Sequence, residues 1–212
     1  APLDPDRMAV CLAEHYQGTL SMFGAPEVQV ELEGEVGLAS AILARAQSAG
    51  IPVTAYGQGG KAASLDHGAL VPLHFLLEAL DNQPRFVELN SSFREPRLHL
   101  AIGGAVREAV DAYSGSVLYV ASGDLSHRLT PSAPAGYNPR GSEFDQLVVD
   151  IFAGGRLDAL QDIPAGLVEA AGECGYRSLL VLAGLVQSSR YATHVLSYEG
   201  PFGVGYLVGR VE

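Results

Sequence analysis

Reactive side chains gather at residues 123–127 (Gly-Asp-Leu-Ser-His), directly after the apolar run at residues 117–121. A run of aliphatic and β-branched residues is typical of a strand that is buried on both faces. Ligands bind at the carboxyl ends of the strands in an open α/β sheet, so a strand with this ending delivers its polar cluster to the binding edge. Asp124 and His127 are therefore predicted to act together in acid–base chemistry. The alternative is that Asp124 only caps the following turn, with His127 on the surface.

A second candidate residue is His67, which stands in an Asp-His-Gly triplet after the glycine-rich segment 57–60. Asp66 beside it can orient the imidazole ring, a common arrangement around histidines that bind metal ions. The glycine-rich segment does not have the GxxxxGK[ST] spacing of a phosphate-binding loop. His67 is therefore a candidate metal ligand, whereas His74, among the leucines of the following helix, is expected to be a core or groove histidine.

A third candidate is Glu173, which lies between two glycines and immediately before Cys174, where an apolar helix is expected to begin. A carboxylate at this position either complements the helix dipole or serves as a ligand at a cleft.

Composition limits the classes of protein to which the chain can belong. With 212 residues, 48% hydrophobic and 17% charged, we expect one globular α/β domain. The net charge of −11 repels nucleic acid and anionic lipid. Cys11 and Cys174 match no disulfide framework, and the apolar runs are too short to span a membrane. No signal-peptide pattern opens the chain, so a cytoplasmic location is expected.

Hydrophobic periodicity predicts an alternation of strands and helices, which is typical of a largely parallel sheet. Helices are expected at residues 4–16, 35–49, 70–80, 96–113, 144–152, 157–160, 165–171 and 178–186. Strands are expected at residues 27–33, 51–56, 85–90 and 117–121, and a hairpin at residues 191–198 and 202–208. The segment 130–141, rich in proline and glycine, is expected to be a loop folded over the cleft.

Four segments in this order resemble the class III (LigB-type) extradiol ring-cleavage dioxygenase superfamily, including its Memo-like branch. They are residues 64–68 (Ser-Leu-Asp-His-Gly) with 71–73, residues 123–127, residues 172–175 (Gly-Glu-Cys-Gly) and residues 198–206. The resemblance covers nearly the whole chain. It implies a single LigB-like α/β domain over residues 1–212, with a mixed, mostly parallel central sheet and helices on both faces. It also implies a mononuclear Fe(II) ion held by two histidines and a glutamate.

The resemblance assigns roles to individual residues. His67 matches the second metal histidine, His127 the acid–base histidine that Asp124 orients, and Glu173 the carboxylate ligand. In the Memo-like branch a cysteine before glycine stands near the position of that carboxylate, so Cys174 remains an alternative. The family's first metal histidine ends the first strand. This form begins at Ala1-Pro2-Leu3, so we expect it to lack that strand and ligand and to bind iron poorly.

The resemblance implies an Fe(II)-dependent dioxygenase that cleaves a catechol-like aromatic diol with dioxygen. The expected partners are therefore the aromatic substrate and dioxygen, without nucleic acid or membrane, and a homo-oligomer is left open. His67, His127 and Glu173 are expected to converge at the carboxyl ends of the strands. One alternative is a non-enzymatic or regulatory Memo-like protein that binds a metal ion on the same fold. Another is a metal-dependent hydrolase that activates water at the same ligands.

Overall fold

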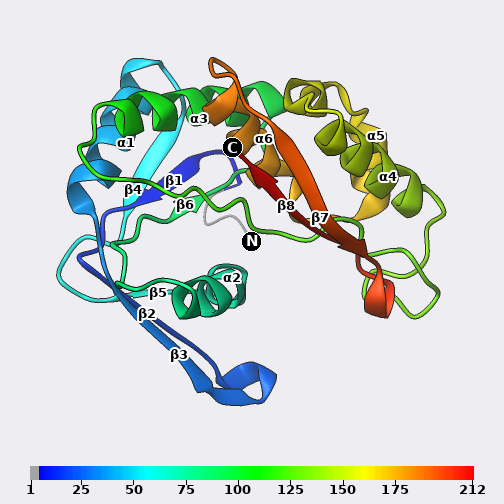
Figure 1. Ribbon diagram of the computed structural model, residues 1–212, viewed down its shortest axis with the longest axis horizontal. Helices are drawn as coiled ribbons and strands as arrows, with labels where there is room; N and C mark the ends of the chain where they lie inside the picture. Colours follow the sequence, from blue (N-terminus) through cyan, green and yellow to red (C-terminus); the bar gives the residue numbers. More distant parts are fainter. Residues whose placement is uncertain (1–4) are drawn as a thin grey trace. The chain divides into compact units, whose positions relative to one another are not determined.

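The computed structural model describes residues 5–212 and contains two compact units whose elements are labelled in Figure 1. The first unit contains the described residues up to Arg94 together with Ala105–Ser122, and the second contains Glu95–Gly104 and Gly123–Glu212. Helix α3 (Pro96–Asp111) contributes its first turns to the second unit and the remainder to the first. Both units combine helices with strands, which confirms the predicted α/β class.

The first unit holds a three-stranded sheet in the order β4-β1-β6. Its central strand, β1 (Met8–Cys11), runs parallel to β4 (Val53–Tyr56) and antiparallel to β6 (Leu89–Asn90). All four residues of β1 are buried, and because successive side chains point to opposite faces, both faces of this strand are covered. Helix α1 (Val36–Ser48) packs on β1 and β4 through an apolar stripe at helical spacing. The buried residues of that stripe are Leu38, Ala39, Ile42 and Ala46.

A second sheet of the first unit has the order β3-β2-β5. Strand β2 (His15–Leu20) forms a hairpin with β3 (Ala25–Glu33) through the 3-10 turn η1 (Ser21–Phe23), and it pairs in parallel with β5 (Ala63–Ser64). Along β3 the side chains alternate between buried and exposed, as the period-2 pattern predicts. Helix α2 (His67–Glu78) packs against this hairpin, drawn in blue in Figure 1.

The second unit is a group of helices beside a two-stranded antiparallel sheet, in the order β7-β8. Its helical elements after α3 are α4 (Arg140–Ala153), η2 (Leu157–Asp162), α5 (Ala165–Ala171), α6 (Tyr176–Val186) and η3 (Pro201–Gly203). Its strands are β7 (Thr193–Glu199) and β8 (Tyr206–Val211), which confirm the expected C-terminal hairpin. The apolar core lies between the helices, and Phe144, Val148, Leu157 and Leu180 are fully buried in it.

Two expected elements are wrong. The helix expected at residues 4–16 is instead the strands β1 and β2, although its start at Asp4, like residues 1–3, lies outside the described residues. Its apolar residues do recur at helical spacing, but Met8–Cys11 is buried on both faces as a central strand. The segment 117–121 belongs to no strand in the described chain, and Leu118 is 68% exposed. Without hydrogen-bonded neighbours, apolar and β-branched composition does not make a strand.

Two further expected elements have different limits in the structure. The strand expected at residues 85–90 is reduced to β6. Helix α2 begins at His67, three residues earlier than expected, because Asp66 caps it.

Within the described residues, no helix combines the length and the apolar character that a membrane span requires.

Candidate functional site

The segment that carries Asp124 and His127 is held by the chain that connects β7 to β8. The amide of Leu125 donates to the carbonyl of Gly205 at 2.9 Å, and the amide of Gly205 donates to the carbonyl of Ser126 at 2.8 Å. Further along, the amide of Leu129 donates to the carbonyl of Gly203 at 3.0 Å. These bonds give residues 125–129 a strand-like attachment to the hairpin, although the segment itself is irregular.

The start of α6 holds the same segment from its other side. The amides of Cys174 and Gly175 both donate to the carbonyl of Asp124, at 3.2 and 2.8 Å, and the amide of Asp124 donates to Cys174 Sγ at 3.1 Å. Gly123 has a φ of +148°, a backbone conformation that residues with a side chain rarely adopt. Gly175 is needed for a different reason, because a Cβ atom there would stand 2.7 Å from the carbonyl oxygen of Gly123. Two glycines at this crossing therefore allow Cys174 to lie beside Asp124.

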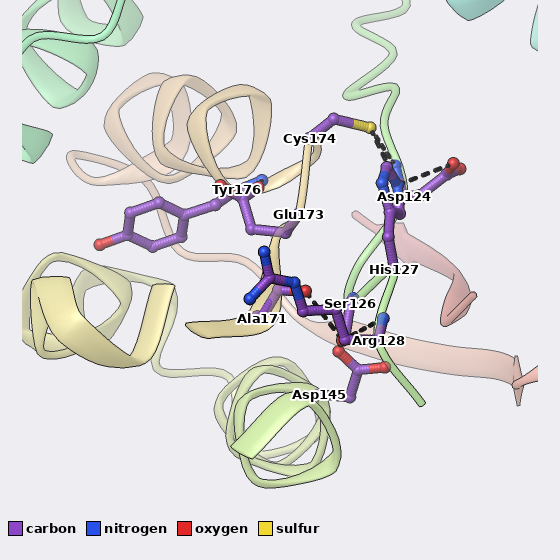
Figure 2. A network of polar contacts seen from close by, with 9 residues as sticks. All are labelled: Asp124, Ser126, His127, Arg128, Asp145, Ala171, Glu173, Cys174 and Tyr176. Carbon is purple, nitrogen blue, oxygen red and sulfur yellow. Dashed lines mark hydrogen bonds and ion pairs between the residues drawn. The ribbon is translucent and has the colours of Figure 1, made fainter. Parts of the chain in front are cut away.

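The side chains of Asp124, His127 and Cys174 form one cluster, shown in Figure 2. His127 Nε2 lies 3.3 Å from Asp124 Oδ2 and 3.7 Å from Cys174 Sγ. One atom from each side chain that could bind a metal ion lies within 4.8 Å of the other two. A carboxylate, an imidazole and a thiolate are each common ligands of divalent transition metals. The cluster can therefore share one proton between its members or hold one cation.

The charge state of the cysteine depends on its surroundings. Burial raises the pKa of the Cys174 thiol, and the carboxylates of Asp124 and Glu173 raise it further, while the hydrogen bond from the Asp124 amide opposes the rise. The thiol therefore remains protonated at neutral pH until a cation stabilises the thiolate. The side chains of His127 and Asp124 are 26% and 40% exposed, so small molecules can reach them.

Glu173 is close in sequence to this cluster, but its carboxylate is bonded to the start of α6. Oε2 accepts the amide hydrogen of Tyr176 at 2.6 Å, and Oε1 pairs with the guanidinium of Arg177 at 3.3 Å. The side chain is 2% exposed, and this burial raises the pKa of Glu173 although both partners oppose the rise. These contacts match the helix-terminus role that the sequence left open, and the role of Glu173 as a metal ligand remains a prediction.

His67 belongs to the first unit, where it is the first residue of α2. The carboxylate of Asp66 accepts the amide hydrogen of Ala69 at 3.1 Å and caps the helix. The imidazole of His67 lies near the ring of Phe23, with 5.2 Å between the ring centroids. The structure thus brings Asp124 and His127 together within the second unit, while the convergence of His67 with them and its role as a metal ligand remain predictions.

Sequence reasoning missed two buried polar residues, Ser126 and Asp145, both of them fully buried. The hydroxyl of Ser126 donates to the carbonyl of Ala171 at 3.0 Å and accepts the amide hydrogen of Arg128 at 3.0 Å. Asp145 lies three and seven residues before Val148 and Phe152, on the apolar face of α4. An aspartate at that spacing within a buried stripe is the signal that would have found it.

Comparisons with known proteins agree with the fold. A family model described as the catalytic LigB subunit of aromatic ring-opening dioxygenase matches residues 5–209. Protein CA_C1420 of Clostridium acetobutylicum is 34% identical over an alignment of 212 positions, which covers 98% of this chain and 45% of that protein. The chain thus spans about half the length of this curated relative.

A solved structure shares the architecture. The crystal structure of the uncharacterized protein JW3007 from Escherichia coli K12 matches 97% of this chain and 80% of that chain. Its TM-score is 0.64 at 20% sequence identity, so this likeness concerns the fold alone. Because the family model covers nearly all of the described residues, the chain belongs to the LigB family of aromatic ring-opening dioxygenase catalytic subunits.

Proposed function

We propose that the chain is the catalytic part of a non-haem, Fe(II)-dependent extradiol dioxygenase that acts on a catechol-like aromatic diol. The observation that carries the proposal is the contact of His127 Nε2 with Asp124 Oδ2 at 3.3 Å and with Cys174 Sγ at 3.7 Å. Membership of the LigB family supports the same class of chemistry.

The donor set fits a divalent metal ion. Cys174 Sγ faces His127, whereas both oxygens of Glu173 are already bonded to Tyr176 and Arg177. These contacts support Cys174 over Glu173 as the ligand from this segment. His67 is proposed as a further ligand on the family resemblance. Bound Fe(II) would supply a Lewis acid for the diol and a binding position for dioxygen.

Proton transfer is the proposed task of His127. Its imidazole would take a phenolic proton from the bound diol and return it when the ring opens, because imidazole can both accept and donate a proton. The carboxylate of Asp124, at 3.3 Å, would stabilise the imidazolium that forms and keep the ring in place. The side chain of His127 is 26% exposed, which leaves the imidazole open to a substrate.

A second candidate function is metal binding without ring cleavage, in a regulatory role. It is favoured by one observation, which is that the donor atoms of Asp124, His127 and Cys174 all face one another within 4.8 Å. In this case His127 would itself be a ligand through Nε2, the nitrogen that contacts Asp124 and Cys174.

Iron content and oxygen uptake together distinguish these functions. The protein is purified without oxygen, loaded with Fe(II) and mixed with a panel of catechols, alongside His127→Ala, Cys174→Ala, Glu173→Gln and His67→Ala variants. The dioxygenase proposal predicts that His127→Ala keeps its iron and loses oxygen uptake, whereas Cys174→Ala and His67→Ala lose iron. Glu173→Gln is expected to keep it.

The other outcomes are equally informative. If His127→Ala loses iron as completely as Cys174→Ala, and iron-loaded wild-type protein consumes no oxygen with any catechol, the result supports metal binding without ring cleavage. Unchanged iron stoichiometry in His67→Ala would reject the ligand role of that histidine.

A further inference from the structure

We propose that Asp145 is the positioning residue of this site, and that it fixes the backbone between Asp124 and His127. The inference rests on the proposed metal site at Cys174, because it concerns the geometry of the side chains around that ligand. Asp145 lies on α4, which contributes no member of the cluster, and its side chain is fully buried.

The contacts of Asp145 join α4 to the segment that carries Asp124 and His127 and to the β7–β8 hairpin that holds this segment. Oδ1 accepts the amide hydrogen of Ser126 at 2.8 Å, and Oδ2 accepts the hydroxyl hydrogen of Tyr198 on β7 at 2.7 Å. A Cβ atom on Gly205 would collide with Oδ2, so the chain before β8 passes directly against the carboxylate. Figure 2 shows Asp145 beneath Ser126, with the side chain of His127 leaving the same segment.

The hydrogen bond to Ser126 controls the site because this residue stands between Asp124 and His127. The hydroxyl of Ser126 is already bonded to Ala171 and to the amide of Arg128. Asp145 completes the set by binding the Ser126 amide, so the peptide cannot rotate without breaking a buried bond. Rotation of that peptide would move the imidazole of His127 relative to Cys174.

A carboxylate at this position is costly for a purely structural role. Asp145 follows Phe144 and shares its helix face with Val148, both of which are fully buried in the apolar core. Burial of a carboxylate among such residues destabilises the fold unless hydrogen bonds compensate. Here the compensating donors are the Ser126 amide and the Tyr198 hydroxyl.

The chemistry of the two donors identifies a conservative replacement. In Asp145→Asn the amide oxygen can still accept from Ser126, and the amide nitrogen can donate to the Tyr198 hydroxyl, which accepts as well as donates. In Asp145→Ala both donors lose their partner. The variant Phe144→Leu is the matched control, since it weakens the packing of α4 but leaves both hydrogen bonds of Asp145 in place.

The test uses Co(II) as the probe, since a cobalt–thiolate absorption band reports binding at Cys174. Titrations of wild type, Asp145→Asn, Asp145→Ala and Phe144→Leu are made well below their melting temperatures, and amide hydrogen exchange at Ser126 is measured without metal. We expect Asp145→Ala to weaken Co(II) binding by about 10- to 100-fold, the usual effect of losing a residue that orients a ligand set. It should also accelerate exchange at Ser126. Asp145→Asn should restore both properties, and Phe144→Leu should lower the melting temperature alone.

Each alternative result has a distinct meaning. Co(II) binding and Ser126 exchange that are unchanged in Asp145→Ala would overturn the positioning role. An effect of Phe144→Leu on both properties as large as that of Asp145→Ala would overturn it too. If wild type shows no cobalt–thiolate band, the proposed metal site fails, and the exchange measurement still decides the role of Asp145. If Asp145→Ala does not fold, Asp145→Leu fills the same space without accepting a hydrogen bond and replaces it.

Discussion

Gly175→Ala probes the crossing that places Cys174 beside Asp124. The backbone of Gly175, with φ −95° and ψ −18°, suits alanine, so the substitution introduces no conformational strain. The added Cβ would stand 2.7 Å from the carbonyl oxygen of Gly123 and 2.9 Å from that of Asp124. Both are backbone atoms, which cannot rotate away as the end of a side chain can. The two segments must therefore separate by several tenths of an ångström.

The size of the effect follows from this overpacking. Inserting one methyl group into a closely packed crossing costs about 1–3 kcal/mol. For a protein of this length, each kcal/mol lowers the melting temperature by about 2–4 °C. Gly166→Ala is the matched control because it lies in α5, where an added Cβ meets no atom within 4 Å. Alanine there should raise stability by up to about 1 kcal/mol.

Thermal and denaturant unfolding of both variants, with a Co(II) titration, measure the prediction. Gly175→Ala should melt earlier and bind Co(II) more weakly, since Cys174 moves with its neighbour, whereas Gly166→Ala should bind as wild type does. A Gly175→Ala protein with wild-type stability would refute the argument from the close crossing.

Two further predictions concern buried or capping carboxylates. Burial raises the pKa of Asp145 above its ordinary 3.8, so the folded state holds this proton more firmly than the unfolded chain. The free energy of unfolding of wild type, compared with that of Asp145→Asn, should therefore be greatest at low pH. This difference should fall as pH rises from 3.8 through the folded-state pKa. Denaturant unfolding at several pH values measures it, and a difference that does not change with pH would contradict the prediction. Asp66→Ala removes the cap of α2 and should lower the stability of the fold by about 1 kcal/mol, while Asp66→Asn keeps the acceptor and should cost little. Equal losses of stability in the two variants would show that the hydrogen bond to Ala69 contributes nothing.

Amphipathic elements with clear ends could be predicted from the sequence, as α1 and the C-terminal hairpin show. The first strands could not. Met8 and Leu12 recur at helical spacing, but in a short buried run such spacing does not separate a strand from a helix, and it misled the prediction. The segment 117–121 shows the opposite error, because strand formation depends on a hydrogen-bonding neighbour that composition does not reveal.

The site could be predicted only in part. Asp124 and His127 are three residues apart, so a local motif sufficed to suggest that they act together. Cys174 and Glu173 are adjacent in sequence, and only the direction of each side chain separates a thiol that faces His127 from a carboxylate bonded to α6. Asp145 reaches the site through the backbone amide of Ser126. Backbone contacts of this kind carry no residue-type signal at the partner position.

The separation of His127 and Cys174 by 47 positions along the chain has a consequence for unfolding. Helices α4 and α5 lie entirely within that interval. In the second candidate function His127 is itself a ligand, and an ion bound to both side chains would act as a cross-link that closes this interval into a ring. Such a cross-link removes entropy from the unfolded chain as a disulfide does. The helices inside the ring could then separate fully only after the ion leaves. The melting temperature of the second unit would therefore rise with metal concentration and fall when a chelator is added, so unfolding becomes a measure of how much of the protein carries metal.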